Sequence, residues 1–216
     1  MQGMRHRGPD LDTESSLFAA GAALVGCVDE AGRGPLAGGV HVGIVVVGPS
    51  TDTLDGVDDS KRLGEHSRLE LVPRIEEWAV ATAVGVATST EIDDHGMMSA
   101  LRLALRRAIA QLPAVPDAVV LDGNYDFLNR PMPVPGEPWT GTLDVVTLTH
   151  GDSRSAGVAA ASVLAKTRRD AEMIGLDLAH PGYGWATNKG YGTAAHRDAI
   201  RRLGPSPFHR RSFRLL

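Results

Sequence analysis

The chain has 216 residues, of which 43% are hydrophobic and 22% are charged, a composition typical of one soluble globular domain with its own core. Its single cysteine, Cys27, lies in an apolar run, which excludes an internal disulfide framework and a cysteine-rich zinc site and fits a reducing compartment. The net charge of −4 is distributed unevenly, because residues 1–150 hold 11 Lys+Arg and 21 Asp+Glu whereas residues 151–216 hold 11 and 5.

The basic C-terminal third is expected to face phosphate groups, with Arg210 and Arg211 as two of the contacting side chains. The alternative is that this charge is only a solvated surface. An overall negative chain can therefore still bind a polyanion, provided that the polyanion meets this part of the surface.

Residues 17–28 form an apolar run that resembles the core of a signal peptide. The run follows three acidic residues and leads directly into Asp29 and Glu30, and its 12 residues are too few to span a bilayer. We predict a short helix that leads into a buried strand, a flexible stretch over residues 1–15, and a cytoplasmic protein that does not bind membranes.

The first half of the chain predicts three strands and a helix. Residues 24–29 and 39–48 are apolar enough for two buried strands, and the Gly/Pro-rich segment between them suits a hairpin. A helix is expected at 64–79 and a third strand at 80–88.

The clearest helix is predicted at 97–112, where six apolar residues share one face and Arg102, Arg106 and Arg107 lie opposite. We interpret this helix as structural.

The second half predicts strand and helix units. Residues 118–122 and 143–149 are expected to be strands, separated by a Pro-rich loop at 131–138, and helices are expected at 155–170 and 193–203. The alanine-rich composition of the first of these helices allows it to approach the sheet closely. Three meandering strands followed by strand and helix units indicate an α/β fold with a mixed sheet flanked by helices.

Two adjacent carboxylates, Asp29 and Glu30, end the first buried strand, where an ordinary apolar strand carries none. Neighbouring strand residues face opposite sides. For both to reach one site, we expect the backbone to leave strand geometry at this point, with Gly32 and Gly34 permitting the turn. An acidic hairpin turn is the alternative.

Asp122 also follows a buried strand, and Asp152 follows the last predicted strand. Open α/β sheets place their sites at such strand ends. Taken alone, Asp152 is better explained as the N-cap of the helix that begins near residue 155 than as a metal ligand.

Four carboxylates that converge from three strand ends suit hard divalent cations, Mg²⁺ or Mn²⁺. The histidines at 150, 180, 196 and 209 are too scattered to form a zinc motif. Two such cations about 4 Å apart can activate water and stabilise a leaving oxygen. Phosphodiester hydrolysis by a nuclease is the chemistry that this arrangement favours.

Several sequence blocks, in order from about residue 20 to 213, resemble the bacterial ribonuclease HII family. The blocks are residues 29–38, Asp59-Ser60-Lys61-Arg62-Leu63, Leu121-Asp122-Gly123-Asn124, Gly151-Asp152-Ser153, residues 159–170, Lys189-Gly190-Tyr191-Gly192-Thr193 and His209-Arg210-Arg211-Ser212-Phe213. The only three lysines of the chain, at 61, 166 and 189, all lie in these blocks.

The resemblance implies a ribonuclease H-like mixed sheet flanked by helices, in one domain over residues 1–216, with a basic, helical, substrate-binding extension at about 180–216. It implies an acidic metal site formed by Asp29, Glu30, Asp122 and Asp152. The implied activity is cleavage of the RNA-containing strand of RNA/DNA hybrids, and incision on the 5′ side of single ribonucleotides in duplex DNA, leaving 3′-hydroxyl and 5′-phosphate ends. Mg²⁺ or Mn²⁺ is the implied cofactor and a monomer is expected.

Substrate contacts are implied for five more residues. Gly32, Arg33 and Gly34 would hold the backbone around the ribonucleotide and its 2′-hydroxyl, the group that distinguishes RNA from DNA. Tyr191 would pack on the deoxyribose that follows, and Lys61 is assigned to substrate binding. Arg33 as a structural counter-ion of the acidic pair is the alternative.

The sequence departs from the family pattern at two positions, with Asn188 where His is common and His150 where a basic residue is common. These leave the finer DNA contacts open. Alternative functions are the sister family ribonuclease HIII, a binding module without catalysis, and a structural protein whose acidic strand ends bind nothing. The Gly-Arg-Gly turn and the lack of a sizeable N-terminal substrate-binding domain favour ribonuclease HII over HIII.

Overall fold

The computed structural model describes residues 8–216, so the expectation for residues 1–7 lies outside the described part. Helix α1 (Asp12–Ala19) starts before the predicted short helix, and it corrects the expected flexible stretch from residue 12 onward. The physical reason is Glu14, which is fully buried and accepts hydrogen bonds from the Ser155 hydroxyl at 2.5 Å and the Gly157 amide at 3.2 Å. Glu14 thereby ties α1 to the beginning of a later helix.

The centre of the molecule is a mixed five-stranded sheet in the order β3-β2-β1-β4-β5. Its strands are β1 (Val25–Ala31), β2 (Val40–Val47), β3 (Ala81–Ala87), β4 (Ala118–Asp122) and β5 (Asp144–Leu148). Strands β1 to β3 pair antiparallel as a meander, whereas β1, β4 and β5 pair parallel. The carboxyl ends of these three parallel strands therefore meet at one edge of the sheet.

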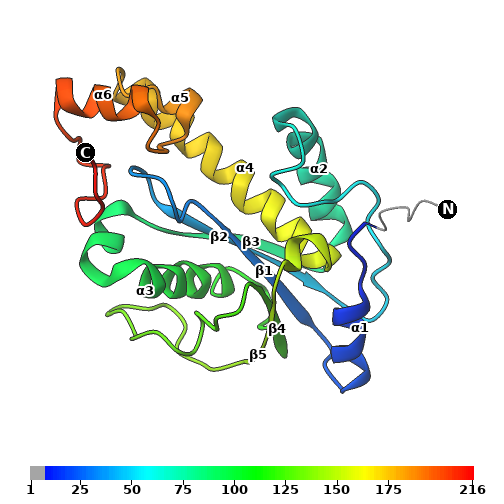
Figure 1. Cartoon of the computed structure of the whole chain (residues 1–216). Coiled ribbons are helices and arrows are strands. Elements are labelled where there is room, and N and C mark those ends of the chain that lie inside the picture. Colours follow the sequence, from blue (N-terminus) through cyan, green and yellow to red (C-terminus); the bar gives the residue numbers. More distant parts are fainter. Residues whose placement is uncertain (1–7) are drawn as a thin grey trace, which may run out of the picture.

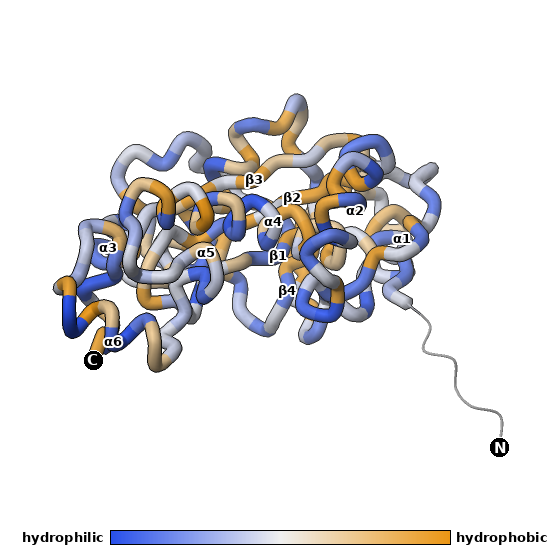
Figure 2. Tube along the Cα trace, turned by 90° about the horizontal axis from the view of Figure 1, so that it is seen from above, coloured by the Kyte–Doolittle hydropathy of each residue, from blue (hydrophilic) through white to orange (hydrophobic). Residues whose placement is uncertain are grey.

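Helices cover both faces of the sheet (Figure 1). Helix α3 (Ser89–Ile109) packs on one face, against apolar side chains that include Val28 and Ile44. Helices α2 (Glu65–Trp78) and α4 (Ala156–Ala179) pack on the other, against the alternate residues that include Cys27 and Val45. Seen from above, the strands show hydrophobic colours at the centre of the chain trace (Figure 2).

The alanine-rich helix α4 approaches the sheet as closely as predicted. A Cβ atom at Gly43, the partner of Asp29 in the β1–β2 ladder, would lie 2.5 Å from the carbonyl oxygen of Ala161. Glycine at this position brings α4 against the strand that carries Asp29.

Two helices are longer than predicted. Helix α3 starts at Ser89 because Thr88 and Glu91 form a capping box, and it contains a break at Gly96 (φ 77°, ψ 160°). Helix α4 continues to Ala179 instead of ending at residue 170. The mixed sheet and its flanking helices are confirmed.

Arg102 and Arg106 are buried and Arg107 is partly exposed on the arginine face of α3, and the amphipathic pattern did not predict burial on this face. The irregular segment 123–143 folds over it, so that Arg102 donates hydrogen bonds to the Leu128 carbonyl and to the Glu137 carboxylate, both at 2.7 Å. Arg106 donates to the Trp139 carbonyl at 2.6 Å. The buried arginines of α3 thus bind the irregular segment 123–143 that covers this face of the helix.

The C-terminal extension contains helices α5 (Trp185–Asn188) and α6 (Ala194–Leu203). They pack in a third, smaller apolar cluster that includes Leu36, Met173 and Trp185, at the end of the sheet where β1 turns into β2. Among residues 8–216, no helix is long and apolar enough to cross a membrane.

Candidate active site

Three aspartates meet at the edge where the parallel strands end. Asp29 lies near the end of β1, Asp122 ends β4, and Asp152 lies in a short 3₁₀ turn, Gly151–Ser153, just after β5. Each offers a carboxylate oxygen, and these oxygens all lie within 4.8 Å of one another. The predicted convergence of carboxylates from three strand ends is present for these three residues.

Glu30 lies beside this group and not in it, and the expected departure from strand geometry at Asp29 and Glu30 is wrong. Strand β1 continues to pair with β2 as far as Ala31 and His41. Asp29 therefore faces α4, whereas Glu30 lies on the α3 side and accepts a hydrogen bond from Arg33 Nη1 at 3.0 Å.

Both carboxylates still reach one pocket because β1 extends beyond its neighbour. Its pairing with β4 ends at Val28 and Leu121, so the following residues have no strand beside them on that side. A pocket of about 240 Å³ opens there, and its lining includes Asp29, Glu30 and Asp122.

Main-chain and lysine donors hold the other two aspartates. The Gly151 amide donates to Asp122 Oδ1 at 2.7 Å, and Lys61 Nζ donates to Asp152 Oδ2 at 3.0 Å. Ser155 is the N-cap of α4, since its hydroxyl accepts from the Val158 amide at 3.0 Å. The capping explanation for Asp152 is therefore wrong.

Burial and the closeness of several carboxylates make the charged forms of Asp29 and Glu30 unfavourable in this site. Burial raises the pKa of Asp29 well above its usual range, and the charges of Glu30 and Asp122 raise it further, against the opposing effect of Ser162. Burial also raises the pKa of Glu30, and Arg33 only partly offsets this. Burial lowers the pKa of Lys61, but the hydrogen bond and charge of Asp152 outweigh that effect and raise it.

These residues fit a hard divalent cation. The donor set is all carboxylate oxygen, the ligand type preferred by Mg²⁺ and Mn²⁺. In addition, Glu30 Oε2 is buried without a hydrogen-bond partner among the described residues. A bound cation would satisfy this oxygen and relieve the repulsion that raises the pKa of Asp29.

The residues assigned to substrate line the same pocket. Gly32, Arg33, Gly34, Lys61 and Tyr191 all contribute to its wall. The Tyr191 side chain is exposed, and a Cβ atom at Gly34 would lie 3.7 Å from its ring. The structure thus brings the turn after β1 and the segment before α6 to one surface.

Asn188, where the family commonly has His, organises the backbone in front of Tyr191. Its side-chain amide donates to the Tyr183 carbonyl at 2.7 Å, and its side-chain oxygen accepts from the Gly190 amide at 2.8 Å. His150 adopts a left-handed conformation, φ 56°, immediately before the turn that carries Asp152. Both departures therefore occupy turns next to site residues.

Four further polar residues line the pocket although no role was predicted for them individually: Ser60, Ser162, Lys166 and Arg169. Ser60 and Ser162 share a hydrogen bond of 2.7 Å between their hydroxyls. All four fall within the resembling blocks, which was the available signal.

The role expected for Arg210 is corrected by its burial. Its side chain is fully buried, and its guanidinium donates to the main-chain carbonyls of Gly32, Arg33, Gly38 and Gly39 at 2.6–3.0 Å. It cannot meet phosphate from solvent. Its neighbour Arg211 is exposed.

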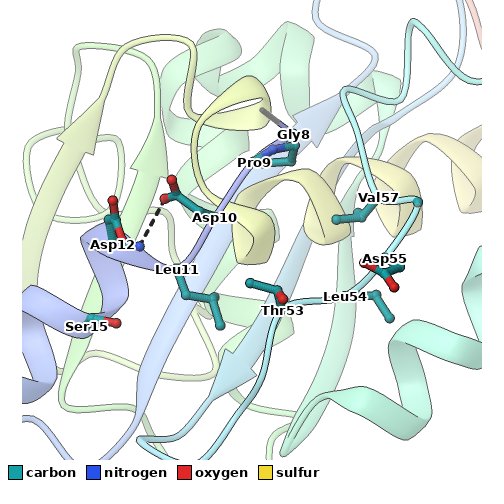
Figure 3. Close-up of a pocket in the computed structure, with 11 residues that line it drawn as sticks. Gly8, Pro9, Asp10, Leu11, Asp12, Ser15, Thr53, Leu54, Asp55 and Val57 are labelled. Carbon is teal, nitrogen blue, oxygen red and sulfur yellow. Dashed lines mark hydrogen bonds between the residues drawn. The ribbon is translucent and has the colours of Figure 1, made fainter. Parts of the chain in front are cut away.

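A larger pocket of about 650 Å³ lies elsewhere, between the start of α1 and residues 53–57 (Figure 3). It shares no lining residue with the aspartate site. One of its carboxylates, Asp10, accepts a hydrogen bond from the Asp12 amide at 3.1 Å, as a local turn at the start of α1. The larger pocket therefore does not include the clustered aspartates Asp29, Asp122 and Asp152.

Known structures share this fold. The crystal structure of the ribonuclease H2 from Pyrococcus horikoshii OT3 superposes with a TM-score of 0.70 at 24% identity, covering 89% of this chain and 94% of that one. The structure of Bst-RNase HIII in complex with Mn²⁺ gives 0.63 at 22% identity, covering 93% and 71%. The mixed sheet and its flanking helices therefore have a ribonuclease H-like fold.

Sequence comparison then identifies the family. The family described as Ribonuclease HII matches residues 26–216. Ribonuclease HII of Rhizorhabdus wittichii is 46% identical over 206 residues, which cover 95% of this chain and 93% of that protein. The chain belongs to the ribonuclease HII family and is a nuclease, a hydrolase of phosphodiester bonds.

Proposed function

We propose that this enzyme hydrolyses the RNA strand of RNA/DNA hybrids in the cytoplasm and incises duplex DNA on the 5′ side of single embedded ribonucleotides. The products would carry 3′-hydroxyl and 5′-phosphate ends. The observation that carries the proposal is the group of three aspartate carboxylates within 4.8 Å of one another beside a pocket lined by Gly32, Arg33, Gly34 and Tyr191.

Asp29, Glu30, Asp122 and Asp152 are proposed to hold Mg²⁺ or Mn²⁺. Two cations held by these carboxylates would supply activation of a water molecule and stabilisation of the leaving oxygen. Support for the metal comes from the carboxylate donor set, from the raised pKa of Asp29, and from the Mn²⁺ complex of the similarly folded RNase HIII.

The remaining residues are proposed to select the substrate. The turn formed by Gly32, Arg33 and Gly34 would contact the ribonucleotide and its 2′-hydroxyl, and Tyr191 would pack on the following deoxyribose. Lys61, whose ammonium donates a hydrogen bond to Asp152, would contact a phosphate next to the metal site. We expect the enzyme to act as a monomer.

Cleavage of labelled duplexes tests the proposal directly. A duplex with one ribonucleotide and an RNA/DNA hybrid should be cut with Mg²⁺ or Mn²⁺ and not with EDTA, while an all-DNA duplex stays intact. Mapping the ends of the products checks the predicted 5′-side incision. Cleavage of the all-DNA control at the same rate would contradict the ribonucleotide specificity.

The substitution Asp122→Asn tests whether Asp122 is needed for metal binding and not for folding. The substitution keeps the size of the side chain and removes one carboxylate, so cleavage should be lost while the protein still folds. Mn²⁺ should stabilise the wild type by about 2.7 kcal/mol at a hundredfold excess over its dissociation constant, and the variant by much less. Full activity of the folded variant would remove Asp122 from the site.

A further inference from the structure

The turn after β1 is held from beneath by a buried arginine. Arg210 lies in the C-terminal segment, which runs beside the loop joining β1 to β2 (Figure 1) and forms a bridge there between Ala37 and His209. Its Nη2 donates to the carbonyls of Gly32 at 2.6 Å and Gly39 at 3.0 Å. Its Nη1 and Nε donate to Arg33 and Gly38, both at 3.0 Å. One guanidinium thus joins the two ends of the loop.

These carbonyl bonds fix the direction of two amides. A trans peptide unit is planar, and its C=O and N–H groups point in opposite directions. The carbonyls of Gly32 and Arg33 point at Arg210, so the N–H groups of Arg33 and Gly34 point away from it. Neither N–H donates to an acceptor within residues 8–216, and both residues line the pocket. The turn therefore presents two unused donors at the pocket wall.

A second buried arginine links the same loop to the segment of Tyr191. Arg169 donates to the Ala37 carbonyl at 3.2 Å and to the Lys189 carbonyl at 2.9 Å, and its guanidinium carbon lies 6.0 Å from the centre of the Tyr191 ring. A Cβ atom at Gly32 would lie only 2.2 Å from Arg169 Nε. Glycine at position 32, with φ 99°, is what allows the turn to rest on this side chain.

We propose that Arg210, assisted by Arg169, is a positioning residue that aims the amides of Arg33 and Gly34 at the ribonucleotide. This inference rests on the proposed function, because it assigns the recognition of a 2′-hydroxyl or its adjacent phosphate oxygen to those two amides. Only arginine fits the position, since its planar fork carries five N–H donors whereas lysine has three on a single nitrogen.

The test compares Arg210→Lys with Arg102→Lys. Arg102 is also a buried arginine that holds a loop through carbonyl bonds, but it lies under residues 128–137 and does not line the pocket. Both variants should lose some thermal stability. Under single-turnover conditions on a single-ribonucleotide duplex, at a temperature where both are folded, Arg210→Lys should be slower by about tenfold, as for loss of one hydrogen bond in the transition state. Arg102→Lys should cleave at the wild-type rate.

The NMR resonances of the Arg33 and Gly34 amides provide a measurement that a loss of stability alone would not change. With EDTA present, the single-ribonucleotide duplex should shift the Arg33 and Gly34 amide resonances of the wild type more than an all-DNA duplex does. In Arg210→Lys this difference should disappear, while Mn²⁺ affinity stays unchanged. If Arg210→Lys does not fold, Arg169→Lys should show the same slowing and the same loss.

Two results would overturn the inference and leave the proposed function standing. One is a wild-type rate in folded Arg210→Lys, and the other is equal slowing in Arg102→Lys. Failure of the wild type itself to cut the single-ribonucleotide duplex would instead overturn the proposed function, and the inference with it.

Discussion

Tyr191 presents an aromatic ring to solvent at the wall of the pocket. Its side chain is 46% exposed, and the glycines on both sides, Gly190 and Gly192, give it no shielding from its own chain neighbours. An exposed ring with an apolar face and a polar tip is suited to contact with a sugar or base. The backbone of Tyr191 is fixed, since its amide donates to the Asn188 carbonyl at 2.9 Å.

Tyr191→Ala should therefore impair cleavage at a single ribonucleotide without affecting the metal site. Stacking on a base is worth roughly 1–3 kcal/mol, and a sugar contact lies at the lower end, so a loss of about tenfold is expected. Tyr191→Phe should be milder than Tyr191→Ala if packing of the ring dominates, and equally severe if the hydroxyl contacts the substrate. Single-turnover rates and Mn²⁺ affinity measured side by side check this, and a wild-type rate in Tyr191→Ala would show that the ring is structural.

At the scale of single residues, carboxylates could be predicted and the buried arginines could not. Asp29 and Asp122 stand out because ordinary apolar strands do not end in charged residues, whereas Asp152 also had an explanation as a helix N-cap. Arg210 stood in a basic segment, where a phosphate contact was the natural interpretation. In the structure its guanidinium bonds to four carbonyls that are more than 170 positions away in sequence, and no local pattern records such contacts.

The C-terminal elements are joined by a buried histidine pair. Trp185 Nε1 donates to His196 Nε2 at 3.0 Å, and the Ser206 amide donates to His209 Nδ1 at 2.9 Å. His209 must therefore carry its proton on Nε2, from which it donates to His196 Nε2 at 3.1 Å. His196 carries its proton on Nδ1 and donates to the Tyr191 carbonyl at 2.9 Å. Both rings are neutral in this arrangement.

This pair should make the fold less stable in mild acid. Burial, together with His196, lowers the pKa of His209 to about 4, and burial also lowers the pKa of His196, to which the charge of Arg197 contributes. Because the folded pKa lies below the unfolded value of about 6.5, the unfolded chain binds more protons, so stability is full above pH 6.5 and falls as the pH decreases towards 4.

Urea unfolding at pH 7 and pH 5 measures this effect. His209 should account for a loss of about 2 kcal/mol in the free energy of unfolding between the two pH values. His209→Gln removes this titration, so its loss over the same interval should be smaller by about that amount. The difference between the pH-dependent losses of the wild type and of His209→Gln cancels the contributions of other titrating groups, such as His41 and the acidic site. An identical pH dependence in both proteins would contradict the neutral pair.

At the scale of elements, the bounds of β4 and α6 were predictable, whereas the early start of α3 and the short helix α5 were not. Strand β4 and helix α6 lie within one residue of their predicted bounds because period and capping agree there. The early start of α3 depends on a capping box, Thr88 with Glu91, that the apolar period does not show. The four-residue helix α5 is set by tertiary contacts, with Trp185 buried in the third cluster.

Across the whole molecule, the basic residues are concentrated in the C-terminal third of the chain. The structure shows which of these basic side chains are exposed and which are buried. Of the 11 Lys+Arg in residues 151–216, Arg169 and Arg210 are buried and hold the turn after β1. Arg168, Arg202 and Arg211 are exposed, so we expect phosphate contacts from side chains of this kind. Arg211 follows Arg210 directly, and its amide donates to Asp93 on α3 at 2.8 Å, which fixes its backbone beside the turn.

Arg211→Ala should therefore weaken duplex binding through the salt-dependent part of the affinity. Each phosphate contact releases counterions, so the slope of log affinity against log salt should become shallower by about 1. The loss should be similar for all-DNA and ribonucleotide-containing duplexes, because phosphates carry no sequence information. Binding measured in EDTA, where no strand is cut, gives the slope. Arg74→Ala on α2 is the matched control, since it removes one exposed arginine from the acidic part of the chain and should leave the slope unchanged. If both substitutions change the slope equally, net charge governs binding and the C-terminal surface has no special place in it.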